Sequence, residues 1–136
     1  MIEIVLEKRP PDVSEYLKLR AAVGWQTTPE LATETALAGA LFSVCVMHGG
    51  EIVGMGRIVG DRGLYYYVQD VIVMPPYQRQ GIGTRIMEEI TAYLDEHAVD
   101  QAFIGLKAGK NLIPFYERFG FSSREEDIPG VFMVRG

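Results

Sequence analysis

Cysteine is almost absent from this chain, because only Cys45 among 136 residues carries a thiol. A single thiol cannot close a disulfide within the chain, so a fold that depends on disulfide bonds is excluded. The first residues also lack the basic segment and the long apolar segment of a secretory signal peptide. These two absences predict a cytoplasmic protein.

Long hydrophobic runs and an excess of basic charge are missing as well. The longest apolar stretch covers residues 36–47 and includes Ser43, whereas a helix that spans a membrane needs about 20 apolar residues. The 13 lysines and arginines are outnumbered by 18 aspartates and glutamates, which leaves a net charge of −5. Because the apolar stretch is this short, no membrane is expected as a partner. A nucleic acid is not expected either, because its binding needs a basic surface to neutralise phosphates.

Histidine is scarce too, and this bears on metal chemistry. His48 and His97 are the only two histidines, and no HExxH or CxxC motif surrounds them. Such motifs supply the ligands of zinc sites at fixed spacing. We therefore expect no bound metal, and both histidines are expected on the surface.

The composition that remains is typical of one globular domain. Hydrophobic residues make up 48% of the chain and charged residues 23%. A chain of this length buries about two thirds of its surface on folding and needs no metal or disulfide for a full core. The sequence has no internal repeat and no linker-like segment, so residues 1–136 are expected to form one domain.

Helical spacing of apolar residues appears at residues 12–24, 27–39, 82–97 and 112–119. Asp12 is the expected N-cap of the first helix, because Glu15 follows at the spacing of a capping box. The segment at 82–97 has an apolar stripe on one side and carboxylates on the other, which is typical of a long amphipathic helix.

Strand-like segments lie at 2–6, 41–47, 52–59, 64–73, 102–106 and 131–134, and they are rich in β-branched and aromatic residues. The three from 41 to 73 are separated by short glycine-containing turns and are expected to form an antiparallel meander. One strand–helix–strand crossover follows. The order of elements therefore predicts a mixed α/β fold.

The strongest chemical signal is the turn between the strand that ends at Val73 and the long helix. Gly81 and Gly83 are expected inside the first helical turn, where each costs about 1 kcal/mol relative to alanine. A helix start leaves four N–H groups unpaired and carries roughly half a positive charge, so it stabilises a bound anion that glycine allows to approach. The alternative is that both glycines serve only close packing of the helix.

Two familiar phosphate-binding patterns do not fit this turn. GxxxxGK[ST] is absent, and GxGxxG fails because Arg85 and Ile86 stand where the third glycine would be. A P-loop that hydrolyses nucleotides is therefore not expected.

Two motifs in the chain resemble those of the GNAT superfamily of N-acetyltransferases. The sequence QRQGIG at 78–83 matches the family's Q/R-x-x-G-x-G/A signature after a central strand, and FYERFGF at 115–121 is similar to the stretch on the family's last helix. The resemblance implies an α+β mixed fold with a central, mostly antiparallel, splayed sheet of about six to seven strands flanked by about four helices.

The same resemblance implies acetyl-CoA as the cofactor. In that family the glycine turn wraps the pyrophosphate, and the central strand offers backbone groups to the pantetheine arm. Asn111 is a further candidate contact with the cofactor. It stands closer to Tyr116 than the family's asparagine does, and the alternative is that it caps the helix. The implied cofactor-binding residues are Ile72, Val73, Gln78, Arg79, Gln80, Gly81, Ile82, Gly83, Thr84 and Asn111.

The implied activity is that of an N-acetyltransferase, in which an amine attacks the thioester directly and a thiolate leaves. Tyr116 is the candidate proton donor to that thiolate, and the alternative is a core tyrosine. Asp70 is a candidate base for the amine proton, and it could equally cap a neighbouring backbone group. Trp25, near the end of the first helix, is the candidate wall of the acceptor site, unless it belongs to the core.

The acceptor is expected to be a primary amine of a small molecule, such as a polyamine, an amino acid or an aminated antibiotic. A protein or peptide N-terminus is an alternative acceptor. A module that binds acyl-CoA without catalysis, or a domain that serves only interactions, is the alternative to an enzyme. A homodimer is left open by the sequence.

Overall fold

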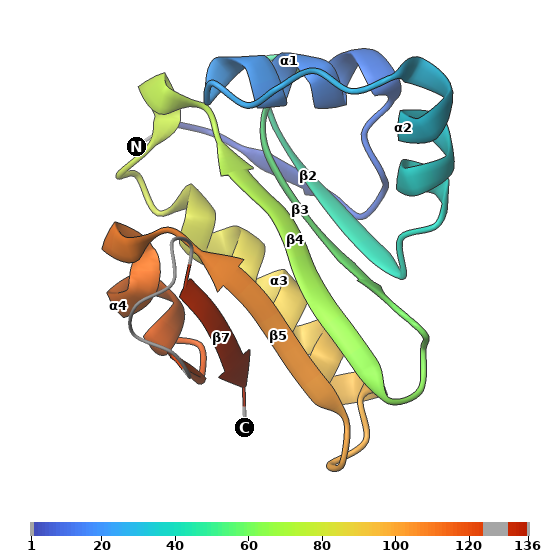
Figure 1. Cartoon of the computed structure of the whole chain (residues 1–136). Helices are drawn as coiled ribbons and strands as arrows, with labels where there is room; N and C mark the ends of the chain where they lie inside the picture. The colour runs from blue at the N-terminus through green and yellow to red at the C-terminus, as the bar shows by residue number, and fades with distance from the viewer. Residues whose placement is uncertain (1, 124–130, 136) are drawn as a thin grey trace.

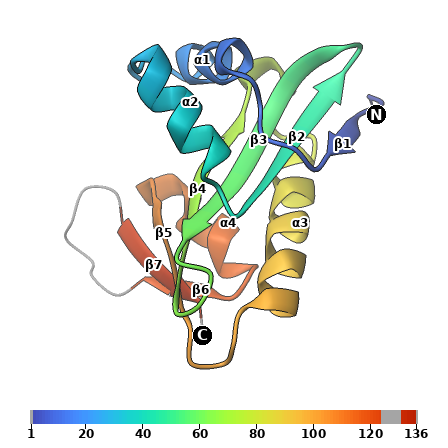
Figure 2. The ribbon, with the colours of Figure 1, turned by 90° about the vertical axis from the view of Figure 1, so that its right-hand side faces the viewer.

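The computed structural model describes residues 2–123 and 131–135. These residues form one seven-stranded sheet in the order β1-β2-β3-β4-β5-β7-β6. Helices α1 and α2 lie on one face of the sheet, and α3 lies on the other face (Figures 1 and 2). Seven strands and four α-helices in the described part of the chain confirm the expected mixed α/β fold.

The elements follow the predicted order closely. The long helix covers the predicted residues, whereas the first strand is shorter than expected and a short strand after the last helix was missed. The strands are β1 Val5–Glu7, β2 Phe42–His48, β3 Glu51–Gly60, β4 Tyr65–Val73, β5 Phe103–Ala108, β6 Phe121–Ser123 and β7 Val131–Arg135; the helices are α1 Val13–Ala22, α2 Glu30–Ala38, α3 Ile82–His97 and α4 Ile113–Glu117, with 3₁₀ turns at Pro75–Tyr77 and Lys110–Leu112.

Helix α3 packs on the meander through its apolar stripe. Its fully buried residues share one core cluster with residues of β2, β3 and β4. Close approach is possible because β3 carries glycine beneath the helix: a Cβ built at Gly56 would lie 2.6 Å from Cγ2 of Ile86 and 2.8 Å from Cδ1 of Ile90. The face of the sheet opposite α3 packs in a second cluster with α1 and α2.

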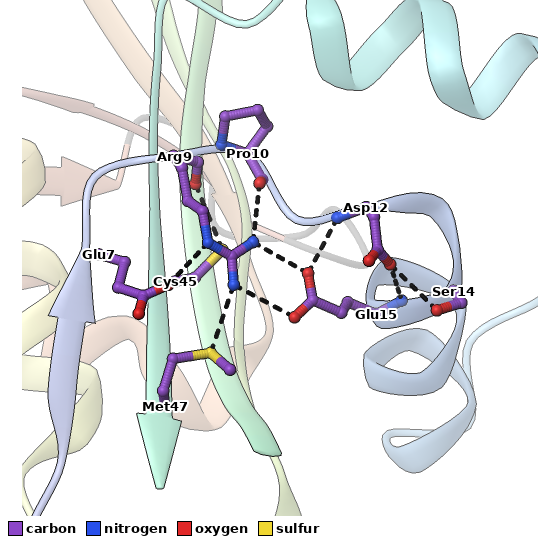
Figure 3. A network of polar contacts seen from close by, with 8 residues as sticks. All are labelled: Glu7, Arg9, Pro10, Asp12, Ser14, Glu15, Cys45 and Met47. Atoms are coloured by element: carbon purple, nitrogen blue, oxygen red, sulfur yellow. Dashed lines mark hydrogen bonds and ion pairs between the residues drawn. The ribbon is translucent and has the colours of Figure 1, made fainter. Parts of the chain in front are cut away.

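Helix α1 is held at its start by a polar network (Figure 3). The Asp12 carboxylate accepts from the Glu15 amide at 2.8 Å, which confirms the predicted capping box. The Arg9 guanidinium binds both oxygens of Glu15 and one of Glu7, and these bonds raise the pKa of Arg9 above its usual value. Buried Cys45 donates from Sγ to the Arg9 carbonyl at 3.3 Å. The network ties α1 to the β1–β2 edge of the sheet.

Strands β4 and β5 run parallel but stay paired over only part of their length. Pairing joins Tyr65–Val68 to residues 103–106 and stops there, and the two arrows separate toward their tips in Figure 1. Beyond that point the register of β4 against β3 shifts, and Asp70 has a φ of 56°. This bulge reverses the alternation of side chains, so that Val68 packs toward α3 but Ile72 toward α1.

Candidate active site

The parting of β4 and β5 opens a cleft of about 340 Å³. Its walls come from the second half of β4, from the end of β5 and the turn after it, from α4, and from the connection that follows α1. The cleft brings together three residues that the sequence singled out from distant positions, namely Trp25, Asp70 and Tyr116. Since each belongs to a different element, only the fold places them in one site.

The start of α3 lies at the end of the turn that follows β4. Gly81 is the N-cap residue in a left-handed conformation with a φ of 82°, so it precedes the helix and does not lie inside its first turn as the sequence suggested. No side chain caps this helix end among the described residues, and a Cβ at Gly81 would meet no atom within 4 Å. The N–H groups at this helix start are therefore open to an anion.

Gly83 has a different reason to be glycine. A Cβ built there would lie 3.4 Å from Cζ of Phe115 and 3.7 Å from its Cε1. Helix α4 therefore packs on the first turn of α3 at this point, as the packing alternative expects. The two interpretations of the glycine pair therefore apply to different residues. Gly81 leaves open space, as an anion site would need, and Gly83 allows close packing.

The turn itself is braced by glutamine side chains. Gln78 donates from Nε2 to the Val73 carbonyl at 2.9 Å, and Gln80 donates from Nε2 to the Pro76 carbonyl at 3.4 Å. Arg79 has a φ of 64°, a left-handed conformation that is uncommon outside glycine. The turn is thus held in one shape by its own residues before it reaches the helix.

Ile72 and Val73 pair with β3 along one edge of β4. Their other edge has no pairing with β5, which ends at Val68, although neither residue is among those that line the cleft. Backbone groups on such an unpaired edge can bind a ligand in the manner of a strand added to a sheet, but the Val73 carbonyl already accepts from Gln78. Ile82, the first residue of α3, is buried in the core and can contribute only its backbone.

Arg118 is a residue of the turn region that the sequence did not single out. Its guanidinium carbon lies 5.7 Å from the ring centroid of Phe115 and 5.5 Å from that of Phe119. Its Nη2 donates to Oγ1 of Thr84 in the first turn of α3, at 3.4 Å. Its place within the FYERFGF motif was the available signal.

Tyr116 packs in the core and also borders the cleft. Its ring is 6% exposed and contacts Phe115 and Phe121 edge to face in the core, and the residue also lines the cleft. Burial raises the pKa of its hydroxyl to about 12. Because this pKa lies far above neutral pH, the hydroxyl keeps its proton, although the same shift makes it a weaker acid than a free tyrosine.

Asp70 is a buried carboxylate at the bulge of β4. Its Oδ2 accepts from the Tyr16 hydroxyl at 2.7 Å and from Nε of Arg57 at 2.8 Å. Its Oδ1 accepts from Nε2 of Gln69 at 3.2 Å and lies 3.9 Å from Nη1 of Arg20. All of these partners are side chains, so the described contacts differ from the backbone cap that was the alternative.

The partners of Asp70 were missed by sequence reasoning. Burial raises the pKa of Tyr16, and its hydrogen bond to Asp70 adds to the same shift. After Glu51 at its first position, β3 has Arg57 as its one charged residue, and Arg57 is 8% exposed. A lone arginine in such a strand was the signal that a buried acid must face it.

Asn111 and Trp25 complete the predicted set. Asn111 is exposed and lies in the 3₁₀ turn before α4. The N-cap residue of α4 is Leu112, and no side chain makes a capping hydrogen bond there. The alternative that Asn111 caps this helix is therefore wrong. Asn111 is also absent from the walls of the cleft, whereas Trp25 is 42% exposed and forms part of them.

Within residues 2–123 and 131–135, no group of three or more histidine, cysteine, aspartate or glutamate side chains is placed to hold a metal ion. No helix in the same ranges is long and apolar enough to cross a membrane.

A family model described as an acetyltransferase (GNAT) domain matches residues 15–129. The chain therefore belongs to the GNAT family of acetyltransferases, as its two motifs predicted. A protein named histone acetyltransferase TAP1, from Glycine max, is 30% identical to it over 132 residues, which cover 89% of this chain and 56% of that protein. The chain spans a little over half the length of the curated relatives it matches.

Solved structures with similar sequences have the same fold. A protein of unknown function from meticillin-resistant Staphylococcus aureus, described as a probable acetyltransferase, is 31% identical with a TM-score of 0.87, and the match covers 94% of this chain and 96% of that one. A GNAT family acetyltransferase from Streptococcus pneumoniae is 34% identical with a TM-score of 0.73, and the match covers 89% of each chain.

The charge at the start of α3 can be tested with two variants of equal shape. Gly81→Asp and Gly81→Asn place side chains of similar size at the same position. Aspartate and asparagine both tolerate its left-handed backbone conformation better than most residues do. Only aspartate adds a negative charge where an anion is expected. We expect coenzyme A to bind Gly81→Asp at least tenfold more weakly than Gly81→Asn in calorimetric titrations. Equal affinities would show that no phosphate lies near this residue.

Proposed function

We propose that this chain transfers the acetyl group of acetyl-CoA to a primary amine of a small molecule. The observation that supports this proposal best is the cleft between β4 and β5, which is lined by Asp70 and by the buried Tyr116. The start of α3, which no side chain caps among the described residues, follows the turn after β4. Positioning of the cofactor and a proton donor near the leaving group both favour such a transfer.

The residues present fit coenzyme A. The N–H groups of residues 79–84 would hold the diphosphate, since Gly81 leaves open space and no described side chain caps the helix start. The free edge at Ile72 and Val73 would bind the pantetheine amides. When bound, acetyl-CoA supplies a thioester carbonyl for the amine to attack and a thiolate as the leaving group.

Tyr116 would donate a proton to the leaving sulfur. A thiol has a pKa near 8.5, so its thiolate leaves more readily with a donor close by. The pKa of Tyr116, about 12, keeps this donor protonated across the pH range in which the enzyme would work.

The amine must lose a proton before it attacks. An alkylammonium with a pKa near 10.4 is only about 0.04% neutral at pH 7, which corresponds to a cost of roughly 4–5 kcal/mol. Asp70 would accept this proton through Oδ1, because Oδ2 is held by two short hydrogen bonds whereas Oδ1 has one longer bond from Gln69. Trp25 would form the wall against which the acceptor lies.

A protein or peptide acceptor is the second candidate, and the name of the soybean relative, a histone acetyltransferase, favours it. Asn111 as a cofactor contact, the cytoplasmic location and a homodimer stay predictions.

A thiol-release assay over a panel of amines tests the proposed function. The panel includes polyamines, amino acids, aminoglycosides, arylalkylamines and a lysine-containing peptide, each with acetyl-CoA. We expect at least one small amine to release free thiol at a rate well above the amine-free control. Release only with the peptide would favour the protein substrate, and tight acetyl-CoA binding without any release would indicate a binding module.

Tyr116→Phe tests the proton donor. The variant keeps the buried ring but removes the hydroxyl, so kcat is expected to fall about 100-fold while the affinity for coenzyme A changes little. With the wild-type protein, Tyr116 loses its proton only near pH 12, so no decline in rate from this group is expected between pH 8 and 10. Tyr93→Phe on α3 is the control, and equal kcat in the two variants would contradict the assignment.

Asp70→Asn tests the base. Without the carboxylate, the reaction depends on amine that is already neutral in solution, so the rate is expected to be low at pH 7 and to rise about tenfold per pH unit below the pKa of the amine. The profile is measured from pH 6 to 9.5 on protein whose folding is confirmed by circular dichroism. A profile parallel to that of the wild type would remove Asp70 from this role.

A further inference from the structure

Arg20, on the last turn of α1, lies between two aromatic rings. Its guanidinium carbon is 5.6 Å from the ring centroid of Tyr16 and 5.5 Å from that of Trp25. Trp25 lines the cleft, whereas Tyr16 is a buried residue of α1 that donates a hydrogen bond to Asp70. Arg20 therefore connects the buried carboxylate of the bulge to the exposed ring of the acceptor wall.

The guanidinium is fixed by hydrogen bonds on several sides. Its Nε donates to the Gln26 carbonyl at 2.8 Å, and its Nη1 donates to the Tyr16 hydroxyl at 3.3 Å. The Trp25 amide in turn donates to the Arg20 carbonyl at 2.8 Å, across the left-handed turn at Gly24. The Arg20 side chain is 17% exposed as a result, which is low for an arginine near a helix end.

A role in pairing with Asp70 alone does not account for this placement. Arg57 already binds that carboxylate at 2.8 Å, whereas the nearest Arg20 nitrogen is 3.9 Å away. The shortest contact of Arg20 is with the carbonyl of the residue after Trp25. The Arg20 side chain thus bonds most closely to the segment that carries the Trp25 indole.

The indole needs such an anchor, because 42% of Trp25 is exposed. An exposed aromatic side chain samples several rotamers unless a neighbour selects one. A guanidinium placed over an indole ring attracts it and favours one rotamer. Trp25 is also one of the residues that line the cleft.

We propose that Arg20 is a positioning residue for the acceptor site: placed over the Trp25 ring and bonded to the Gln26 carbonyl, it holds the indole in place along the cleft, and Tyr16 holds Arg20. This inference rests on the proposed function, since it takes the cleft to be the place where the amine binds.

The chain has a single tryptophan, so its fluorescence reports on Trp25 alone. We compare the wild type with Arg20→Met and Arg20→Lys. Both variants lose the planar guanidinium and its Nε donor, but only Arg20→Lys keeps the positive charge. In both variants we expect the acrylamide quenching constant to rise about twofold. We also expect KM for the amine identified by the panel to rise about fivefold to tenfold, with KM for acetyl-CoA unchanged.

Lys18→Met is the matched control on the same helix, because Lys18 forms an exposed ion pair with Glu51 and has no described contact with Trp25. It is expected to match the wild type in quenching and in both KM values. Unchanged quenching in the Arg20 variants, an equal loss for both substrates, or failure of both Arg20 variants to fold would each overturn the inference. If the wild type neither binds acetyl-CoA nor releases thiol, the proposed function fails, and the quenching result still decides whether Arg20 anchors Trp25.

Discussion

The separation of β4 from β5 is the constraint on which the rest of the site depends. Two parallel strands that stayed paired along their whole length would satisfy each other's backbone groups and leave no room for a ligand. Here the pairing ends at Val68, and a bulge with Asp70 in a left-handed conformation follows directly. The free strand edge and the cleft are both consequences of this departure from a regular sheet.

The bulge is stabilised by the buried carboxylate that it carries. An ionised group in the core is costly unless its oxygens are well bonded, and Tyr16, Arg57 and Gln69 supply the donors. Arg57 also donates from Nη1 to the carbonyl of Ala36 in α2, at 3.4 Å. Asp70 thus links the layer of α1 and α2 to the strand that borders the cleft.

Local patterns in the sequence predicted most elements, because apolar periodicity, caps and glycine turns are properties of neighbouring residues. Helix α3 is the clearest case, with a long amphipathic stripe and the predicted ends. Strand β6 was missed because three residues are too few to show a period. The Asp70 network was also missed, since Tyr16 is 54 positions away and nothing local marks it as a partner. The different roles of Gly81 and Gly83 depend on where Phe115 packs, which only the fold decides.

The central claim is that main-chain N–H groups at the start of α3 bind the diphosphate of coenzyme A. Amide nitrogen–proton NMR spectra recorded during a coenzyme A titration test it residue by residue. The account predicts that the largest shifts occur at Gly81, Ile82, Gly83 and Thr84, and that the resonances of α1 move little. Saturable binding that leaves these four amides unshifted would contradict it.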